Sequence, residues 1–131
     1  MSPKPSTAKG NILVVDDEAV VRNLLLRALI SVGFEVRAAE SGEKALEEAG
    51  QHRFDLVLLD IALPGLDGLQ VLQRLRALYP ECLVIMLTAK EDLELARTAM
   101  TLGACDYLTK PIEIDTIRKV LRTHLAFSSN P

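Results

Sequence analysis

Two kinds of hydrophobic segment alternate along the chain. Uninterrupted apolar runs occupy residues 11–15, 56–59 and 82–87, and shorter, more polar runs occupy 34–38 and 105–109. A short apolar run of the first kind is typical of a strand that is buried on both faces in a parallel sheet. The run at 34–38 alternates between apolar and polar residues, which indicates a strand at or near an edge of the sheet.

Between these runs, hydrophobic residues recur at the spacing of amphipathic helices. The spacing predicts helices over about 18–32, 42–49, 67–78, 91–102 and 113–125. The side chains expected to face the core are Val21, Leu24, Leu25, Ala28, Leu29, Val32, Ala45, Leu46, Ala49, Leu69, Leu72, Leu75, Leu78, Ile114, Ile117, Leu121 and Leu125. The helix at 91–102 has apolar residues on more than one face, which is typical of a helix that also binds a partner.

The alternation of five strands with five helices defines the expected fold class. It predicts βαβ units with right-handed crossovers and a parallel sheet. We therefore expect an α/β fold, a three-layer α/β/α sandwich whose five-stranded parallel sheet has the flavodoxin-like order 2-1-3-4-5. This domain would span residues 10–126, after a disordered leader at 1–9 and before a tail or the start of a linker at 127–131.

Composition narrows the class of protein. Hydrophobic residues make up 49% of the 131 residues and aromatic residues only 4%, so the core must be aliphatic. A net charge of -3 supplies no basic surface for nucleic acid. No apolar stretch is long enough to span a membrane, and no secretory signal is present. Cys82 and Cys105 are too few for a disulfide framework and are interpreted as small buried thiols. A cytoplasmic protein without a nucleic-acid or membrane partner is expected.

Carboxylates follow two of the predicted buried strands. Asp16 and Asp17 come directly after the first strand, and Asp60 ends the third. In the order 2-1-3-4-5 these strand ends lie side by side at the switch point of the sheet, where such folds bind ligands. Three convergent carboxylates repel one another unless their pKa values rise or a cation holds them. The residue types suit Mg²⁺, with Mn²⁺ as a substitute.

Two other strand ends carry groups that suit a phosphoryl ligand. Thr88 offers a hydroxyl after the fourth strand, and Lys110 offers an ammonium after the fifth. Each has an ordinary explanation, since Thr favours strands and Lys is usually a solvated surface charge. Acids at the start of a helix, as in Asp16-Asp17-Glu18, also complement its dipole. The acids, the threonine and the lysine all occur at the carboxyl ends of predicted strands, and this common position nevertheless indicates a functional site.

These motifs resemble those of the receiver domains of response regulators in two-component signalling. The resemblance covers about residues 10–125, with every motif in order and correctly spaced. The segments that carry it are Val14–Glu18, Leu58–Asp60, Leu63–Gly68, Leu87–Ala89 and Gly103–Pro111.

The resemblance implies a role for each site residue. Asp60 would accept a phosphoryl group from a histidine of a sensor histidine kinase or phosphotransfer protein. Asp17 and Asp60 would bind Mg²⁺ directly, with Asp16 acting largely through a water. The Ala62 backbone carbonyl would be a further ligand. The phosphoryl oxygens would be bound by Thr88, Ala89 and Lys110, and the Lys110–Pro111 peptide bond would be cis.

The resemblance also implies a switch. Thr88 would swing toward the phosphoryl group and Tyr107 would move into the vacated space, although a half-buried strand aromatic is the plainer interpretation of Tyr107. The helix at 91–102, the Tyr107 strand and the last helix would form the face that controls a downstream protein or a fused output domain. A homodimer on activation is a further expectation. Such a protein is not an enzyme, apart from catalysing its own phosphorylation and dephosphorylation.

Three alternatives remain open at the level of sequence. A Mg²⁺-dependent phosphohydrolase with an Asp nucleophile would have a second acid two residues later, where this chain has Ala62. A nucleotide-binding module would need a Gly-rich turn after the first strand. A receiver-like interaction scaffold would have no use for the intact set of site residues. His52 and His124 lack an orienting carboxylate pattern and are not expected to carry phosphoryl groups.

Overall fold

The structure is a computed structural model, and it describes residues 9–125. The expected leader, apart from Lys9, and the expected tail lie outside these residues. The described elements are β1 (Asn11–Val15), α1 (Ala19–Ser31), β2 (Glu35–Ala39), α2 (Gly42–Gln51), β3 (Leu56–Asp60), α3 (Gly68–Leu78), β4 (Leu83–Thr88), the short 3₁₀ helix η1 (Lys90–Asp92), α4 (Leu93–Thr101), β5 (Asp106–Thr109) and α5 (Ile114–Leu125).

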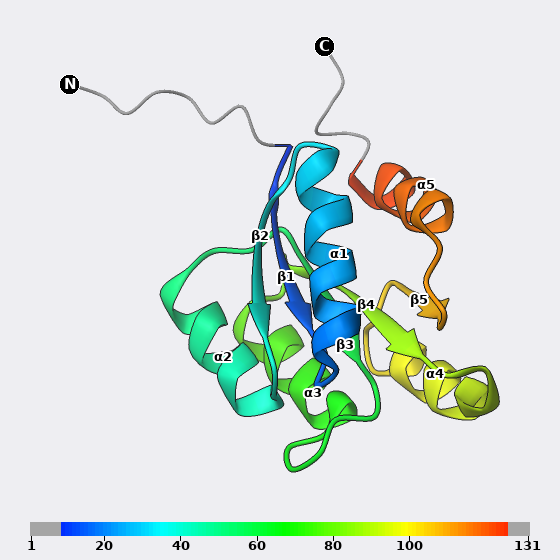
Figure 1. Ribbon diagram of the computed structural model, residues 1–131. Helices are drawn as coiled ribbons and strands as arrows, with labels where there is room; N and C mark the ends of the chain where they lie inside the picture. Colours follow the sequence, from blue (N-terminus) through cyan, green and yellow to red (C-terminus); the bar gives the residue numbers. More distant parts are fainter. Residues whose placement is uncertain (1–8, 126–131) are drawn as a thin grey trace.

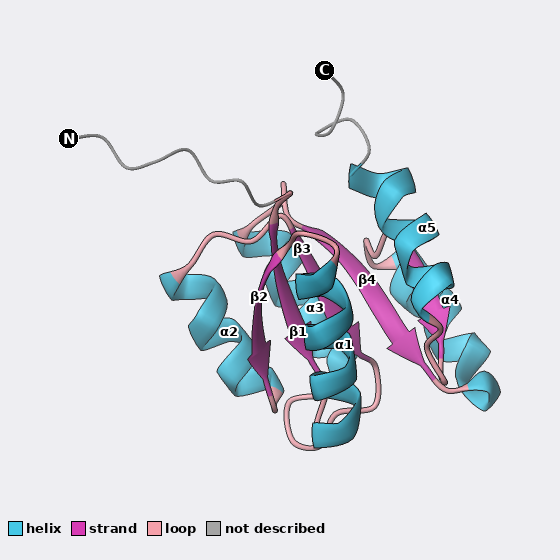
Figure 2. Cartoon of the chain, turned by 45° about the horizontal axis from the view of Figure 1, so that its top comes forward, coloured by secondary structure: helices cyan, strands magenta, loops and turns pink. Residues whose placement is uncertain are grey.

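The five strands form one sheet in the order β2-β1-β3-β4-β5, and every pairing is parallel. The predicted fold class and strand order are therefore confirmed. Figure 1 shows the strand arrows pointing the same way, with α1 and α5 in front of the sheet. The helices α2, α3 and α4 pack against the other face, and Figure 2 shows α3 behind the sheet.

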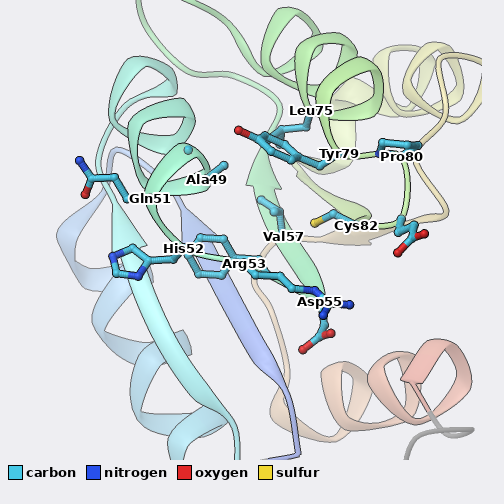
Figure 3. Close-up of a pocket in the computed structure, with 13 residues that line it drawn as sticks. Ala49, Gln51, His52, Arg53, Asp55, Val57, Leu75, Tyr79, Pro80 and Cys82 are labelled. Carbon is cyan, nitrogen blue, oxygen red and sulfur yellow. The ribbon is translucent and has the colours of Figure 1, made fainter.

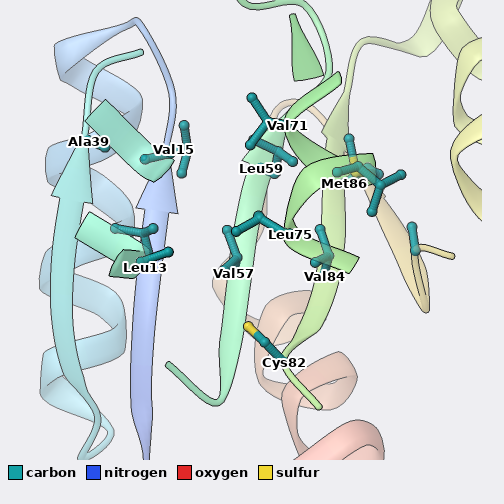
Figure 4. Packing of buried hydrophobic residues seen from close by; sticks show 14 of the residues in the cluster. Leu13, Val15, Ala39, Val57, Leu59, Val71, Leu75, Cys82, Val84 and Met86 are labelled. Carbon is teal, nitrogen blue, oxygen red and sulfur yellow. The ribbon is translucent and has the colours of Figure 1, made fainter. Parts of the chain in front are cut away.

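Two aliphatic cores hold the three layers together. One lies between the sheet and the helices α2, α3 and α4, where Leu13, Val57 and Val84 of neighbouring strands meet Leu75 of α3 (Figure 4). The other lies between the sheet and the helices α1 and α5, where Leu58 packs with Leu29 and Leu121. All residues of β3 are buried, as expected for a central strand covered on both faces.

The register brings the functional strand ends to one edge of the sheet. Residues at the carboxyl ends of neighbouring strands are paired across the ladder: Val15 with Leu59, Asp60 with Leu87, and Thr88 with Thr109. The residues that follow or end these strands, including Asp16, Asp60, Thr88 and Lys110, therefore lie along the same edge.

The start of α3 packs directly against the end of β3. Asp67 caps the helix by accepting the Gln70 backbone N–H at 3.0 Å, and the Gln70 side chain accepts the Asp67 backbone N–H at 3.1 Å. At Gly68, an added Cβ would lie 2.4 Å from the Asp60 carbonyl oxygen and 2.6 Å from Ile61 Cα. Only glycine permits this close approach of helix and strand.

Three side chains predicted to face the core are exposed instead. The buried stripes are centred on Leu25, Ala28 and Leu29 in α1 and on Val71, Leu72 and Leu75 in α3. Helical periodicity then places Leu24, 46% exposed, and Leu78, 61% exposed, at the margins of the stripes. Ile114, 40% exposed, opens the first turn of α5.

Two helix boundaries also differ from the prediction. Glu18 is the N-cap of α1 rather than its first residue, in an extended conformation. The helix expected over 91–102 is divided into η1 and α4. Leu93, Leu95 and Met100 of α4 are exposed whereas Ala96 and Ala99 are buried, so α4 does have apolar residues on more than one face.

Candidate functional site

Three carboxylates converge at the carboxyl ends of β1 and β3. Asp16 is fully buried, Asp60 is 4% exposed, and Asp17 is exposed at the mouth of the crevice. One oxygen from each lies within 4.8 Å of the others. The adjacency of the two strands brings these residues together across more than forty positions of sequence.

The fold holds Asp16 in place through its backbone and one carboxylate oxygen. Oδ1 accepts the Glu18 backbone N–H at 2.9 Å, and the Asp16 carbonyl accepts Arg22 Nη1 at 2.8 Å. The other oxygen, Oδ2, is buried and has no donor in hydrogen-bonding geometry within the described part of the chain. It is compensated only by charge, because Lys110 Nζ lies 2.8 Å away.

Lys110 places its ammonium among three acids. Nζ lies 2.8 Å from Asp16 Oδ2, 3.3 Å from Asp60 Oδ2 and 3.3 Å from Glu18 Oε1. Burial by itself lowers the pKa of Lys110, but the close contact with Asp16 and the charges of Asp60 and Asp16 outweigh burial and raise this pKa above its ordinary value. The side chain is therefore a permanent cation. The Lys110–Pro111 peptide bond is cis.

Asp60 is a carboxylate held in an unfavourable environment. Burial raises the pKa of Asp60, and the neighbouring charge of Asp16 raises it further. The Ala62 backbone N–H, which donates to Asp60 Oδ1 at 3.0 Å, and the Lys110 ammonium act in the opposite direction, but the net pKa of Asp60 stays above its ordinary value.

This raised pKa predicts how stability depends on pH. The folded protein binds a proton at Asp60 more tightly than the unfolded chain does, so stability is lost as the pH rises through the pKa of Asp60 in the folded state. We expect Asp60→Asn to be more stable than the wild type at neutral pH in metal-free buffer. This advantage should disappear below about pH 4, where Asp60 is protonated in both states. Urea unfolding of both proteins from acidic to neutral pH measures the difference in their free energies of unfolding. A difference that is independent of pH would contradict the prediction.

Thr88 lies at the same edge but takes part in a different set of contacts. Thr88 is fully buried, and its single O–H is shared between the carbonyls of Ala89, at 3.3 Å, and Asp92, at 3.4 Å. The Lys110 backbone N–H donates to the Thr88 carbonyl at 2.8 Å, which joins the ends of β4 and β5. Tyr107 is 38% exposed on β5. The Ala62 backbone N–H donates to Asp60. Among the contacts of residues 9–125, the Ala62 carbonyl oxygen has none with the acidic cluster.

The donor set fits a hard divalent cation. Carboxylate oxygens are the ligands that Mg²⁺ prefers, and the exposed side chain of Asp17 leaves one side open to water and to phosphate oxygens. The buried Asp16 Oδ2, which has charge compensation but no aligned donor, is the atom that such an ion would satisfy.

A separate hollow of about 520 Å³ opens at the opposite edge of the sheet, between the ends of α2 and α3 (Figure 3). Tyr79, Val57 and Cys82 line it, and none of the predicted site residues does. Burial raises the pKa of the Cys82 thiol to about 11, so this cysteine is a protonated thiol at neutral pH. It behaves as a small apolar side chain, as predicted.

The fold and the acidic cluster define a class of protein: a flavodoxin-like domain with three carboxylates at the switch point of its sheet. The family is identified by sequence comparison. The profile of the family described as "Response regulator receiver domain" matches residues 12–122. The chain belongs to this family, the receiver domains of two-component response regulators.

Individual relatives agree with this assignment. The chain is 36% identical over 119 residues to the sporulation initiation phosphotransferase F of Bacillus subtilis, covering 91% of this chain and 96% of that protein. It is 40% identical over 117 residues to the uncharacterized transcriptional regulatory protein YkoG of the same organism, covering 89% of this chain and 51% of that protein. The receiver domain of NtrX from Brucella abortus superposes with a TM-score of 0.84 at 37% identity, covering 88% of this chain and 98% of that domain.

The chain corresponds to only part of several relatives. It spans about half of YkoG and 23% of the transcriptional regulator NtrC of Escherichia coli, with which it shares 40% identity over 107 residues. Both relatives are therefore longer than the segment that matches this chain. Within residues 9–125, no helix is long and apolar enough to cross a bilayer.

Sequence reasoning missed one member of the site. Glu18 was interpreted only as part of a motif and the start of a helix, yet its carboxylate contacts Lys110 at 3.3 Å. Glu18 and Lys110 are 92 positions apart in the sequence. The one signal that could have paired them is the strand order, which places the residue after the two aspartates and Lys110 at the same end of the sheet.

Proposed function

We propose that this receiver domain accepts a phosphoryl group onto Asp60 from a phosphohistidine, and that the modification switches the face formed by α4, β5 and α5. The observation that carries the proposal is the position of Asp60: a buried carboxylate with a raised pKa, 3.3 Å from the Lys110 ammonium and within the acidic cluster. A carboxylate in this setting is an available nucleophile beside a fixed positive charge.

In the proposed reaction an Asp60 carboxylate oxygen attacks the phosphorus of a phosphohistidine of a sensor kinase or phosphotransfer protein. The new O–P bond forms as the P–N bond breaks, and the imidazole leaves with its electron pair and takes a proton from water. Lys110 neutralises charge on the transferring group, for which positioning and electrostatics supply most of the catalysis. Asp16, Asp17, Asp60 and the Ala62 carbonyl would hold Mg²⁺, or Mn²⁺ in its place. The bound ion would supply further charge neutralisation.

The proposed switch follows from the contacts of Thr88. The phosphoryl oxygens would be bound by Lys110, by the Thr88 hydroxyl and at Ala89. To reach them, Thr88 must give up its bonds to the carbonyls of Ala89 and Asp92, which tie the end of β4 to η1 and the start of α4. Phosphorylation would thus loosen the connection to α4 and bias a two-state element. Tyr107 would take the space that Thr88 leaves.

The proposed readout is an apolar surface on this side of the molecule. Leu93, Leu95, Met100, Tyr107 and Ile114 of α4, β5 and α5 are each at least 38% exposed. We propose that this surface contacts a downstream protein or a fused output domain, and that it is the dimer contact if the activated protein dimerises. We also propose a cytoplasmic location, in keeping with a sensor histidine kinase as the partner.

Intact-mass spectrometry after incubation with acetyl phosphate tests the proposal. We expect one phosphoryl adduct on the wild type when Mg²⁺ is present, and none when Mg²⁺ is removed by chelation. Asp60→Asn should give no adduct under either condition, because the amide is not a nucleophile toward phosphorus.

Asp67→Asn is a matched control, since Asp67 is an exposed acid that caps α3 outside the crevice. It should be phosphorylated like the wild type. A folded wild type that binds Mg²⁺ but acquires no adduct would favour an interaction scaffold that is never phosphorylated. An adduct that persists in Asp60→Asn would place the acceptor at another residue.

A further inference from the structure

We infer that Glu18 is a positioning residue for Lys110: it holds the ammonium in the resting crevice and is the partner that Lys110 releases when it binds the phosphoryl group. This inference rests on the proposed function and adds to it a residue that competes with the incoming group.

The Lys110 ammonium is crowded by acidic partners. A lysine ammonium has three hydrogens. Three carboxylates lie close to Lys110 Nζ: Asp16 at 2.8 Å, Glu18 at 3.3 Å and Asp60 at 3.3 Å. The ammonium donates hydrogen bonds to Glu18 and Asp60, and it forms an ion pair with Asp16. A phosphoryl oxygen that binds Nζ must therefore compete with these three carboxylates for the same cation.

The three partners of Lys110 differ in burial. The Asp16 side chain is fully buried and makes the shortest of the three contacts, at 2.8 Å, so water cannot replace the ammonium as its partner. The Asp60 side chain, 5% exposed, is the acceptor itself. The Glu18 side chain is 61% exposed, so water solvates its carboxylate once Lys110 leaves. Glu18 is the partner whose release costs least.

The backbone fixes the place of Glu18 independently of the charge of its side chain. The Glu18 N–H donates to Asp16 Oδ1 at 2.9 Å, and its carbonyl accepts the Arg22 N–H at 3.0 Å. As the N-cap of α1, Glu18 makes no side-chain capping bond. Glu18→Gln therefore removes the charge while the backbone contacts that place the residue remain.

The test compares Glu18→Gln with Glu47→Gln in the whole chain. Glu47 is an ideal control because its side chain is also 61% exposed and also pairs with a lysine, Lys44, at 3.8 Å on α2. Both variants change the net charge equally, so a general charge effect would appear in both.

Two measurements are made at low and high ionic strength. The first is the rate at which acetyl phosphate with Mg²⁺ adds the phosphoryl group, followed by intact mass. The second is the affinity for beryllium fluoride with Mg²⁺, an unreactive anion that resembles a phosphoryl group, followed by ¹⁹F NMR. We expect Glu18→Gln to be phosphorylated roughly threefold faster and to bind beryllium fluoride roughly threefold more tightly at low salt, the effect of one unit charge several ångströms away in a wet crevice. Both gains should shrink at high salt.

The outcomes separate the two proposals. If the wild type and Glu47→Gln are phosphorylated and Glu18→Gln shows the same rate and affinity as they do, the role of Glu18 is overturned and the proposed function stands. A lower rate or affinity in Glu18→Gln would also overturn it, because the carboxylate would then assist the reaction. A wild type without any adduct would overturn the proposed function, and this inference with it.

Discussion

Lys110→Met is expected to destabilise the metal-free protein by about 3 kcal/mol at neutral pH, because removing one partner of a buried ion pair leaves the other charge uncompensated. The charges left behind are those of Asp16, fully buried, and Asp60, 4% exposed. The Asp16 Oδ2 atom would have no compensating contact among the described residues. Urea unfolding in the presence of a chelator measures the loss.

The same variant should respond to Mg²⁺ and to acid in a defined way. A divalent cation in the crevice replaces the lost positive charge, so Mg²⁺ should restore more stability to Lys110→Met than it adds to the wild type. Acid should also reduce the difference, because protonation of the carboxyl groups removes the charges that Lys110 compensates. Phosphorylation of the variant should remain severely impaired even with Mg²⁺.

Lys90→Met provides the comparison, because Lys90 is an exposed lysine near the same edge of the sheet. Its stability should stay within about 0.5 kcal/mol of the wild type. Equal stability of Lys110→Met and Lys90→Met in metal-free buffer would contradict the view that Lys110 compensates buried charge.

Gly68→Ala is expected to lower the free energy of unfolding by about 3 kcal/mol, at the upper end of the cost of overpacking. The new Cβ would lie 2.4 Å from the Asp60 carbonyl oxygen, 2.6 Å from Ile61 Cα and 2.8 Å from the Ile61 carbonyl oxygen. These are backbone atoms, which cannot rotate away as a flexible side chain would. The strain therefore has to move the start of α3 or the end of β3.

Because the displaced backbone belongs to Asp60, this variant should also slow phosphorylation beyond what its lost stability explains. Gly50→Ala is the matched control, since its Cβ would meet only the Tyr79 hydroxyl at 3.8 Å, in helix α2. It should be neutral or gain up to about 1 kcal/mol from helix propensity. Circular-dichroism melts of both variants measure the difference, and a Gly68→Ala protein as stable as Gly50→Ala would contradict the close approach described here.

The architecture could be predicted from the sequence because the signals for strands and helix ends are local and are repeated along the chain. The apolar runs of β1, β3 and β4 and the glycines after α1 and α4 divide the chain into units, and the parallel topology then follows from few alternatives. The convergence of Asp16 with Asp60 followed from the strand order. The helix margins were less predictable: Leu24 and Leu78 were expected in the core because spacing gives the period of a helix but not the width of its buried stripe.

The details of the site depend on side-chain geometry that spacing does not encode. The engagement of the Thr88 hydroxyl with the carbonyls of Ala89 and Asp92, and the contact of Glu18 with Lys110, require the turn at η1 and the N-cap of α1 to be placed in space. The division of the predicted fourth helix into η1 and α4 has no signal in the apolar pattern, because η1 consists only of the charged residues Lys90, Glu91 and Asp92.

The two outermost strands have a consequence for how copies of this chain meet one another. Among the strands of residues 9–125, β2 has β1 as its only hydrogen-bonded neighbour. It presents Glu35 and Arg37 as exposed charges, and Arg37 is paired with Glu48 of α2. β5, the other outer strand, is four residues long. Short or charged outer strands are poor templates for a further strand from another molecule. Continuous sheet growth between copies, the route to insoluble fibrils, is therefore disfavoured, and a concentrated preparation should remain clear without a partner covering either edge.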